Sequence, residues 1–217
     1  MKNLLALLLI AATSLSIHAK SSGKGIAESS DLVSPILPGM TVANTCLQDI
    51  DKNKVCTDEI FAEQPTVLVV YRGGWCPYCN AQLNSLKKIE NNLKELGYQI
   101  IAMSPDSNKS VKEQQKRENL SYTLLTDNEM ALSQEMGLAF FLDKKTEKMY
   151  RDRLGVPFVD INGDERVSLP VPAVYLIDKN AMVHFQYVNP NFRVRLDERV
   201  LLVAAQQALK AMKKPKS

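Results

Sequence analysis

Histidine is scarce in this sequence: the 217 residues contain two, His18 and His184. This scarcity limits the chemistry available to the one closely spaced cysteine pair, Cys76 and Cys79 in "WCPYC". A structural zinc site usually needs four ligands, commonly two such pairs or one pair with two histidines. A cysteine protease needs a histidine to accept the thiol proton, and covalent haem attachment needs one directly after the second cysteine, where Asn80 stands. We therefore expect no metal and no other cofactor.

A strong excess of charge of one sign is also lacking. The whole chain has a net charge of +3, and outside residues 1–19 it carries 26 basic and 24 acidic side chains. So small an imbalance gives no reason to expect nucleic acid or an anionic membrane surface as a partner.

Long apolar runs are missing too, and this decides how the N-terminus is interpreted. The stretch from Leu4 to Ala12 is much shorter than the ~20 residues that span a bilayer, so stable membrane insertion is not expected. It follows the basic residue Lys2 and precedes a polar stretch that ends at Ala19. This pattern is typical of a secretory signal peptide. We expect cleavage after Ala19 and an exported protein, periplasmic or secreted.

The chain beyond residue 19 is predicted to form one domain. Residues 20–40 are polar, rich in Gly, Ser and Pro, and aperiodic, which predicts a flexible lead-in, and the domain is expected over 41–214. A β-hairpin is predicted within 41–61. The apolar run 65–73 predicts a strand buried on both faces, and apolar residues three or four apart from Cys79 to Gly97 predict an amphipathic helix. Next come a strand at 98–104, a polar helix from Ser107 or Asn108, a strand at 122–127 and a short helix ending at Gly137.

The last part of the chain predicts an antiparallel hairpin and a final helix. "VPAVYLID" and "MVHFQYV" are separated only by "KNA", which suits a hairpin. Asp197 is a good N-cap for the last helix, Leu196 and Leu201 can form its hydrophobic staple, and the expected apolar face comprises Val200, Ala204, Ala208 and Met212. The order of elements predicts an α/β thioredoxin-like fold, with a central mixed sheet flanked by helices, an N-terminal β-hairpin and an insertion between about Ser104 and Ser168.

The CxxC pair is best suited to redox chemistry. Pro77 fits the first position of a helix that follows a buried strand, so the helix N-terminus would face Cys76 and lower its thiol pKa. Cys76 is thus predicted to be the exposed nucleophile, and Cys79, almost one turn later, the more buried resolving cysteine. Trp75 can shield one side of the pair. A permanent structural disulfide is the alternative, although so small a loop removes little entropy from the unfolded chain.

Two further features accompany this pair. Pro172 precedes the strand in "LPVPAVYLID", where a cis bond would present the Val171 backbone to the cysteines and a trans proline would simply begin a strand; the upstream "WCPYC" favours cis. Cys46 and Cys56 fall on the two arms of the predicted hairpin. They can form a cross-strand disulfide or remain two thiols, and one of them could instead pass electrons to the CxxC pair.

Taken in order, several segments resemble the peroxiredoxin-like branch of the alkyl hydroperoxide reductase/thiol-specific antioxidant family, within the thioredoxin-like superfamily. They are "YRGGWCPYCNAQL", "IIAMSPDS", "YTLLTD", "MGLAF", "NGD" and "LPVPAVYLIDKNAMVHFQYVNPNFRVR". The resemblance covers about residues 40–212. It implies that Cys76 is the attacking cysteine, Cys79 its resolving partner and Pro172 the cis-proline, with Arg72, Gly73 and Gly74 completing the loop.

One departure from the family pattern bears on the activity. Typical peroxiredoxins carry Pro-x-x-x-Thr/Ser-x-x-Cys, and this sequence has Val69 and Gly73 at the proline and hydroxyl positions. Arg72 and Arg151 are candidates for a positive charge near the thiolate. The resemblance implies an antioxidant thiol-dependent peroxidase that uses a peroxide and a thiol donor such as a thioredoxin-like protein. A general thiol-disulfide oxidoreductase acting on protein disulfides and a non-catalytic binding module are the alternatives.

Overall fold

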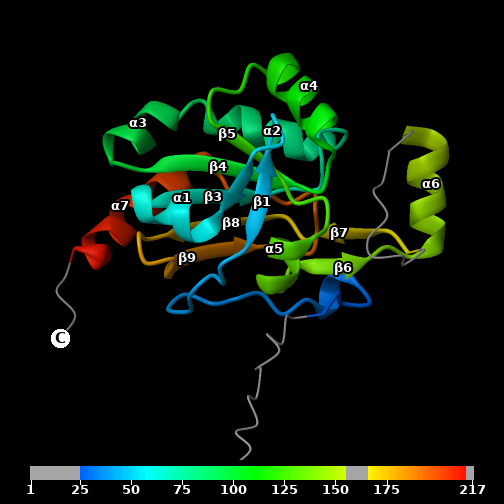
Figure 1. Cartoon of the computed structure of the whole chain (residues 1–217), viewed down its shortest axis with the longest axis horizontal. Coiled ribbons are helices and arrows are strands. Elements are labelled where there is room, and N and C mark those ends of the chain that lie inside the picture. The colour runs from blue at the N-terminus through cyan, green and yellow to red at the C-terminus, as the bar shows by residue number, and fades with distance from the viewer. Residues whose placement is uncertain (1–24, 155–165, 214–217) are drawn as a thin grey trace, which may run out of the picture.

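The computed structural model describes residues 25–154 and 166–213; the predicted signal peptide, residues 1–19, lies outside them. The strands of the main sheet are β1 (Cys46–Asp49), β2 (Lys54–Cys56), β3 (Thr66–Val70), β4 (Gln99–Ser104), β5 (Thr123–Thr126), β8 (Ala173–Ile177) and β9 (Val183–Val188). They lie in the order β2-β1-β5-β4-β3-β8-β9 (Figure 1). β3, β4 and β5 are parallel neighbours, whereas β1–β2 and β8–β9 are antiparallel hairpins.

The central strand β3 is covered on both faces, and this explains its continuous apolar sequence. Val67 and Val69 belong to one hydrophobic core and Leu68 and Val70 to the other, because successive strand residues point to opposite faces. Helices α2 (Pro77–Leu86), α3 (Glu90–Glu95), α4 (Asn108–Glu118) and α7 (Glu198–Met212) contribute to the first core. Helices α1 (Thr57–Glu63) and α5 (Ala131–Glu135) contribute to the second. The predicted mixed sheet flanked by helices is confirmed.

The predicted insertion contains elements that the sequence pattern did not indicate. β6 (Ala139–Phe141) and β7 (Ser168–Pro170) pair as a separate two-stranded sheet, and α6 (Lys144–Leu154) lies beside them at one end of the molecule (Figure 1). Each of these strands has only three residues, too few to show an alternating pattern.

The single helix predicted from Cys79 to Gly97 is wrong, because the structure has α2 and α3 with a turn between them. The amides of Lys88 and Ile89 donate to the carbonyls of Ser85 and Leu86 there, a tighter pattern than that of an α-helix. Leu86, Ile89 and Leu93 remain buried across the break, so the apolar spacing alone could not reveal it. The predicted hairpin is likewise shorter than 41–61, since α1 begins directly after β2.

Residues 25–40, which belong to the predicted flexible lead-in, pack against the domain. The Ala27 amide donates to the Ala139 carbonyl at 2.9 Å, and the Ile36 amide donates to the Met136 carbonyl at 3.0 Å. Ile36 is 4% exposed, and a short 3₁₀ helix spans Ser30–Leu32. The folded part of the chain therefore begins before residue 41.

Helix α7 has the predicted start, and the predicted apolar face is confirmed for Ala208, Ala204 and Met212, which contribute to the core, but not for Val200. The Asp197 side chain accepts a hydrogen bond from the Arg199 amide, as an N-cap does. The buried residues are Leu201, Ala205 and Ala208, whereas Val200 is 53% exposed. The two large residues of the predicted staple, Leu196 and Leu201, are both buried, and this rotates Val200 towards solvent. Within the described residues, no helix is both long and apolar enough to cross a lipid bilayer.

Candidate active site

The two cysteines of the CxxC pair lie where β3 leads into α2. Cys76 is the N-cap of α2, with extended dihedral angles of −87° and 114°, and Pro77 occupies the first helical turn. The amides of Cys79 and Asn80 both donate to the Cys76 carbonyl at 3.1 Å, so the helix starts directly at this residue. A helix N-terminus favours negative charge, which suits a thiolate at Cys76.

Both sulfur-bearing side chains are buried, and this corrects the expectation of an exposed Cys76. Cys76 is 1% exposed and Cys79 is 0% exposed; both are free thiols. The reason is that Trp75 and the segment after β9 pack over the start of α2. Position at a helix N-terminus does not by itself bring exposure.

The two thiols nevertheless differ in acidity. The pKa of Cys76 falls to about 6, chiefly because the Cys79 thiol donates a hydrogen bond to its sulfur, with further help from the charges of Arg72 and Arg195. The pKa of Cys79 is raised well above its usual value, first by burial and then by the hydrogen bond and charge of Cys76. One sulfur is thus a thiolate near neutral pH, while the other keeps its proton.

Arg195 was not identified from the sequence, although it contacts the redox pair. Its Nη2 atom donates to the Cys79 Sγ atom at 3.3 Å, and its Nε and Nη1 atoms are buried without a hydrogen-bond partner among the described residues. Arg195 lies between β9 and α7. In the same segment the Phe192 ring contacts the Tyr78 ring edge-on, with centroids 5.8 Å apart, so the segment lies across the start of α2.

Arg72 is a buried member of the site rather than a surface arginine. It is 3% exposed, its Nη2 atom donates to the Tyr150 hydroxyl at 3.1 Å, and its guanidinium carbon lies 4.2 Å from the Phe192 ring centroid. It is also 5.3 Å from the ring centroids of Trp75 and Tyr150, which themselves lie 5.3 Å apart. Aromatic faces therefore surround the charge.

Arg151, the other arginine considered from the sequence, lies elsewhere. It is exposed on α6, where its Nε atom pairs with Glu147 at 2.9 Å. The structure thus brings Arg72, Trp75, Cys76 and Cys79 together and does not add Arg151 to them.

The loop that presents Cys76 depends on two glycines. Gly73 has a φ of 145°, and a Cβ atom there would lie 2.3 Å from Trp75 Nε1 and 2.7 Å from Asp106 Oδ1. A Cβ atom at Gly74 would lie 2.7 Å from the Gln114 amide carbon. Glycine at position 73 therefore has a steric reason, and the hydroxyl that typical peroxiredoxins carry at this position would not fit.

A buried polar network holds the same loop from beneath. Asp106 Oδ2 accepts a hydrogen bond from the Gly74 amide at 2.6 Å, and burial raises the Asp106 pKa to about 6. Gln114 accepts from the Tyr71 hydroxyl and donates to Asn80 Oδ1, both at 2.8 Å, and Asn80 donates to the Gly74 carbonyl at 2.9 Å. Strand β3, helix α2 and helix α4 are thereby tied to the loop.

Pro172 lies beside this loop, but its peptide bond is trans, since the described residues contain no cis peptide bond. The register pairs Val70 with Ala173, so Pro172 comes next to the residues that follow β3. The Val171 amide donates to the Leu138 carbonyl at 2.9 Å, and the chain runs from β7 into β8. Pro172 therefore begins a strand in trans, and the expectation of a cis-proline is wrong.

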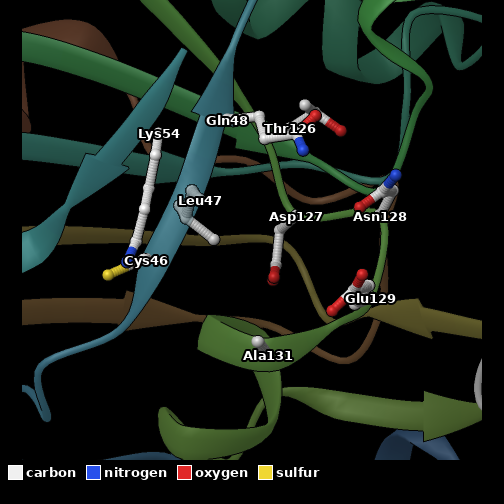
Figure 2. Close-up of a pocket in the computed structure, with 9 residues that line it drawn as sticks. All are labelled: Cys46, Leu47, Gln48, Lys54, Thr126, Asp127, Asn128, Glu129 and Ala131. Atoms are coloured by element: carbon white, nitrogen blue, oxygen red, sulfur yellow. The ribbon is translucent and has the colours of Figure 1, made fainter. Parts of the chain in front are cut away.

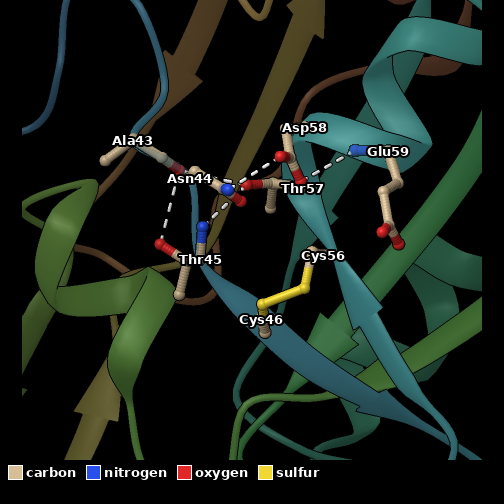
Figure 3. Close-up of a disulfide and its surroundings, with 8 residues drawn as sticks. All are labelled: Ala43, Asn44, Thr45, Cys46, Cys56, Thr57, Asp58 and Glu59. Carbon is tan, nitrogen blue, oxygen red and sulfur yellow. Dashed lines mark hydrogen bonds between the residues drawn. A yellow bond between two sulfur atoms is a disulfide. The ribbon is translucent and has the colours of Figure 1, made fainter.

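Cys46 and Cys56 form a disulfide between directly paired residues of β1 and β2 (Figure 3). Next to it, Thr57 Oγ1 donates to the Ala43 carbonyl and accepts from the Thr45 amide. Strands β5 and β4 separate β1 from β3, which places β1 on the order of 14 Å from β3 across the sheet. The sheet thus holds the hairpin disulfide away from the strand that leads to Cys76.

A hollow of about 240 Å³ beside this disulfide does not have the character of a reaction site (Figure 2). Its buried carboxylate, Asp127, points towards α5 and accepts hydrogen bonds from the Leu132 amide and from the Ser133 amide and hydroxyl. Its cysteine, Cys46, is bound in the disulfide. Among the described residues, no group of three or more metal-ligating side chains gathers at any place.

These features are those of a candidate thiol redox site, with two cysteines of different acidity, on a thioredoxin-like fold. Residues 38–186 match the AhpC/TSA family, and the chain belongs to this family. Peroxiredoxin Q from the chloroplast of Oryza sativa subsp. japonica is 28% identical over 151 residues, which are 70% of this chain and 58% of that protein. The chain thus spans less than two thirds of the length of this relative.

Solved structures of similar fold include two from bacteria. Peroxidoxin BcpB from Mycobacterium tuberculosis has a TM-score of 0.61 at 16% identity, covering 82% of this chain and 98% of that one. Reduced Prx3 from Vibrio vulnificus has a TM-score of 0.62 at 19% identity, covering 79% of this chain and 99% of that one. At these identities the likeness concerns the fold alone.

Proposed function

We propose that the protein is a thiol-dependent peroxidase in which Cys76 attacks the peroxide and Cys79 resolves the product. The observation that carries this proposal is the opposite shift of two neighbouring thiol pKa values, with Cys76 lowered to about 6 and Cys79 raised. Family membership and the name of the rice relative support the same activity.

The chemistry uses only these two sulfurs and a hydroperoxide. The Cys76 thiolate attacks one peroxide oxygen, the O–O bond breaks, and the other oxygen leaves as alkoxide or hydroxide and takes up a proton. The resulting Cys76 sulfenic acid then reacts with the Cys79 thiol, which forms the Cys76–Cys79 disulfide and releases water. A dithiol donor, for example a thioredoxin-like protein, supplies two electrons and two protons to restore both thiols.

Burial of Cys76 favours a peroxide over a protein disulfide as the oxidant. An incoming protein disulfide must bring its sulfur against Cys76, which is 1% exposed. A hydroperoxide is far smaller and needs only a narrow approach. The charges of the buried Arg72 and the half-buried Arg195, which help to lower the Cys76 pKa, also suit the negative charge that develops on the leaving oxygen.

Stopped-flow kinetics with Cys76→Ser and Cys79→Ser test this function. We expect Cys76→Ser to abolish hydrogen peroxide reduction, and Cys79→Ser to react once, at close to the normal rate, and then stop as a sulfenic acid or mixed disulfide. The Cys46→Ala/Cys56→Ala double variant is the matched control and should turn over normally. Full peroxidase activity in Cys76→Ser, or faster reaction of the wild-type protein with a disulfide peptide than with hydrogen peroxide, contradicts the proposal.

We also propose that the protein is exported and matures near Lys20. The support is the apolar segment after Lys2 and the Cys46–Cys56 disulfide, because disulfides persist mainly in oxidising compartments. N-terminal sequencing and intact mass of the native protein test this, and recovery of the full-length chain from the cytosol would refute it.

A further inference from the structure

A small pocket is lined by Arg72 and Pro172, and its wall residue Tyr150 contacts Trp75, the residue before Cys76. Its volume is about 170 Å³. Its apolar walls come from six residues: Phe140, Leu142, Tyr150, Pro172, Pro190 and Phe192. These belong to β6, α6, the start of β8 and the segment after β9, so the fold assembles the pocket from distant parts of the chain.

Arg72 lines this pocket with a charge that has no counter-ion among the described residues. The residue is 3% exposed, and its Nε and Nη1 atoms have no hydrogen-bond partner among the described residues. No carboxylate in that part of the chain forms an ion pair with it; the contacts of the guanidinium are the Tyr150 hydroxyl and aromatic rings. Aromatic faces offset only part of the cost of burying a charge, so the site is suited to an anion.

The balance of charge around the sulfurs leads to the same conclusion. Arg72 and Arg195 both lower the Cys76 pKa, and neither is paired with a carboxylate among the described residues. One thiolate, that of Cys76, offsets one of the two positive charges, because Cys79 keeps its proton. A second anion beside Arg72 would therefore leave the four charges balanced.

The size and walls of the pocket limit the rest of the ligand. An apolar cavity of about 150 Å³ accepts benzene, whereas drug-sized ligands occupy roughly 300 Å³ or more. Asp143 also lines the pocket, and its negative charge would repel an anion. The residue is exposed, so solvent screens its charge, and its side chain accepts a hydrogen bond from the Thr146 amide at the start of α6. A short apolar body with one carboxylate directed to Arg72 fits these constraints.

We propose that this pocket selects organic hydroperoxides that carry a carboxylate on a short apolar body, and that Arg72 binds the carboxylate. This inference rests on the peroxidase function proposed above. Reduction of such a substrate follows the same balanced steps: the Cys76 thiolate takes one peroxide oxygen, and the hydroxy acid leaves after taking up a proton.

Binding of an unreactive probe tests the pocket without any peroxide. Calorimetric titration of the wild-type protein should show benzoate binding at least about tenfold more tightly than benzamide, its neutral analogue of similar shape. The preference should disappear in Arg72→Met and return in part in Arg72→Lys. Lys144→Met, which removes an exposed charge next to Asp143, is the control and should keep it. Equal binding of the two probes, or an unchanged preference in Arg72→Met, overturns the inference.

A kinetic comparison separates this inference from the general function. The ratio of kcat/KM for a short-chain hydroperoxy acid to that for its methyl ester should exceed about ten and fall towards one in Phe192→Ala, which opens the pocket wall. Reduction of both compounds at equal rates overturns the selectivity and leaves the peroxidase function standing. If no hydroperoxide is reduced while benzoate binds through Arg72, the peroxidase function fails and the anion site remains.

Discussion

The Sγ atom of Cys79 lies 3.3 Å from Nη2 of Arg195, while the charges of both Arg195 and Arg72 reach Cys76. The two arginines come from different parts of the chain: Arg72, directly after β3, is buried, and Arg195, before α7, is half-buried. The acidity of Cys76 thus depends on tertiary contacts as well as on its place at the start of α2. The helix N-terminus, the Cys79 hydrogen bond and Arg72 are all close to Cys76 in the sequence, whereas Arg195 comes from a distant part of the chain.

Replacing Arg195 with Met should raise the Cys76 pKa, because it removes a positive charge that stabilises the thiolate. A rise of about one unit from about 6 would lower the thiolate fraction at pH 7 from roughly nine tenths to roughly half. Ultraviolet absorbance of the thiolate as a function of pH measures this directly. Arg195→Lys should restore most of the acidity, and Arg199→Gln, an exposed arginine nearby, should change nothing. A pH profile of Arg195→Met identical to the wild type would contradict the electrostatic role.

At the level of elements, the β1–β2 hairpin carries its own covalent link, and its place in the sheet decides what that link can do. Two strands separate it from β3, the strand that leads to the CxxC pair. The disulfide closes a loop between residues 46 and 56, with a sequence separation of 10. Its main effect should therefore be on stability.

The Cys46→Ala/Cys56→Ala double variant should lower the free energy of unfolding by about 2.5 kcal/mol, the chain-entropy value for so short a loop. Urea unfolding without reductant measures this change. The rate of reaction with hydrogen peroxide should stay within about twofold of the wild type, because the double variant leaves the loop from Arg72 to Cys76 intact. A loss of turnover at unchanged stability would mean instead that the hairpin disulfide takes part in electron transfer.

Local sequence patterns predicted the elements whose signal is local. β3, β4 and β8 appeared as apolar runs because each is buried on both faces, and α2 began where Pro77 placed it. The break between α2 and α3 was missed because the apolar spacing continues through it. Arg195 was missed because no residue near it in sequence marks it as different from Arg193 or Arg199; only packing of the segment against α2 selects it. A cis Pro172 was predicted from the upstream WCPYC and from the family resemblance, but its peptide bond is trans.

For the molecule as a whole, the fold sets both cysteines of the CxxC pair in the core that α2, α3, α4 and α7 cover, and supplies positive charge from Arg72 and Arg195. Burial raises the pKa values of Asp106 and Asp127 to about 6, so the folded protein holds both protons at pH values where the unfolded chain has released them. The folded state loses this contribution to its stability as pH rises through about 6. Cys76 acts in the opposite direction. Its folded-state pKa of about 6 is below the ordinary thiol value of 9.0, so in the reduced protein the folded state releases this proton first.

The reduced protein should therefore gain stability from Cys76 as pH rises from about 6 to about 9. In this window the unfolded chain still holds the thiol proton and the folded chain does not, so the free energy of unfolding rises by up to ~1.4 kcal/mol per pH unit. Below pH 6 this contribution is lost. Urea unfolding of the wild type and of Cys76→Ser, both fully reduced in the same buffer, measures this contribution as the difference between their free energies of unfolding. The contributions of Asp106 and Asp127 are present in both proteins and cancel in this difference. The difference should grow between pH 6 and pH 8 and be flat below pH 5. A constant difference across this range would show that the Cys76 thiolate is not stabilised in the folded protein, and the assignment of Cys76 as the attacking sulfur would lose its physical basis.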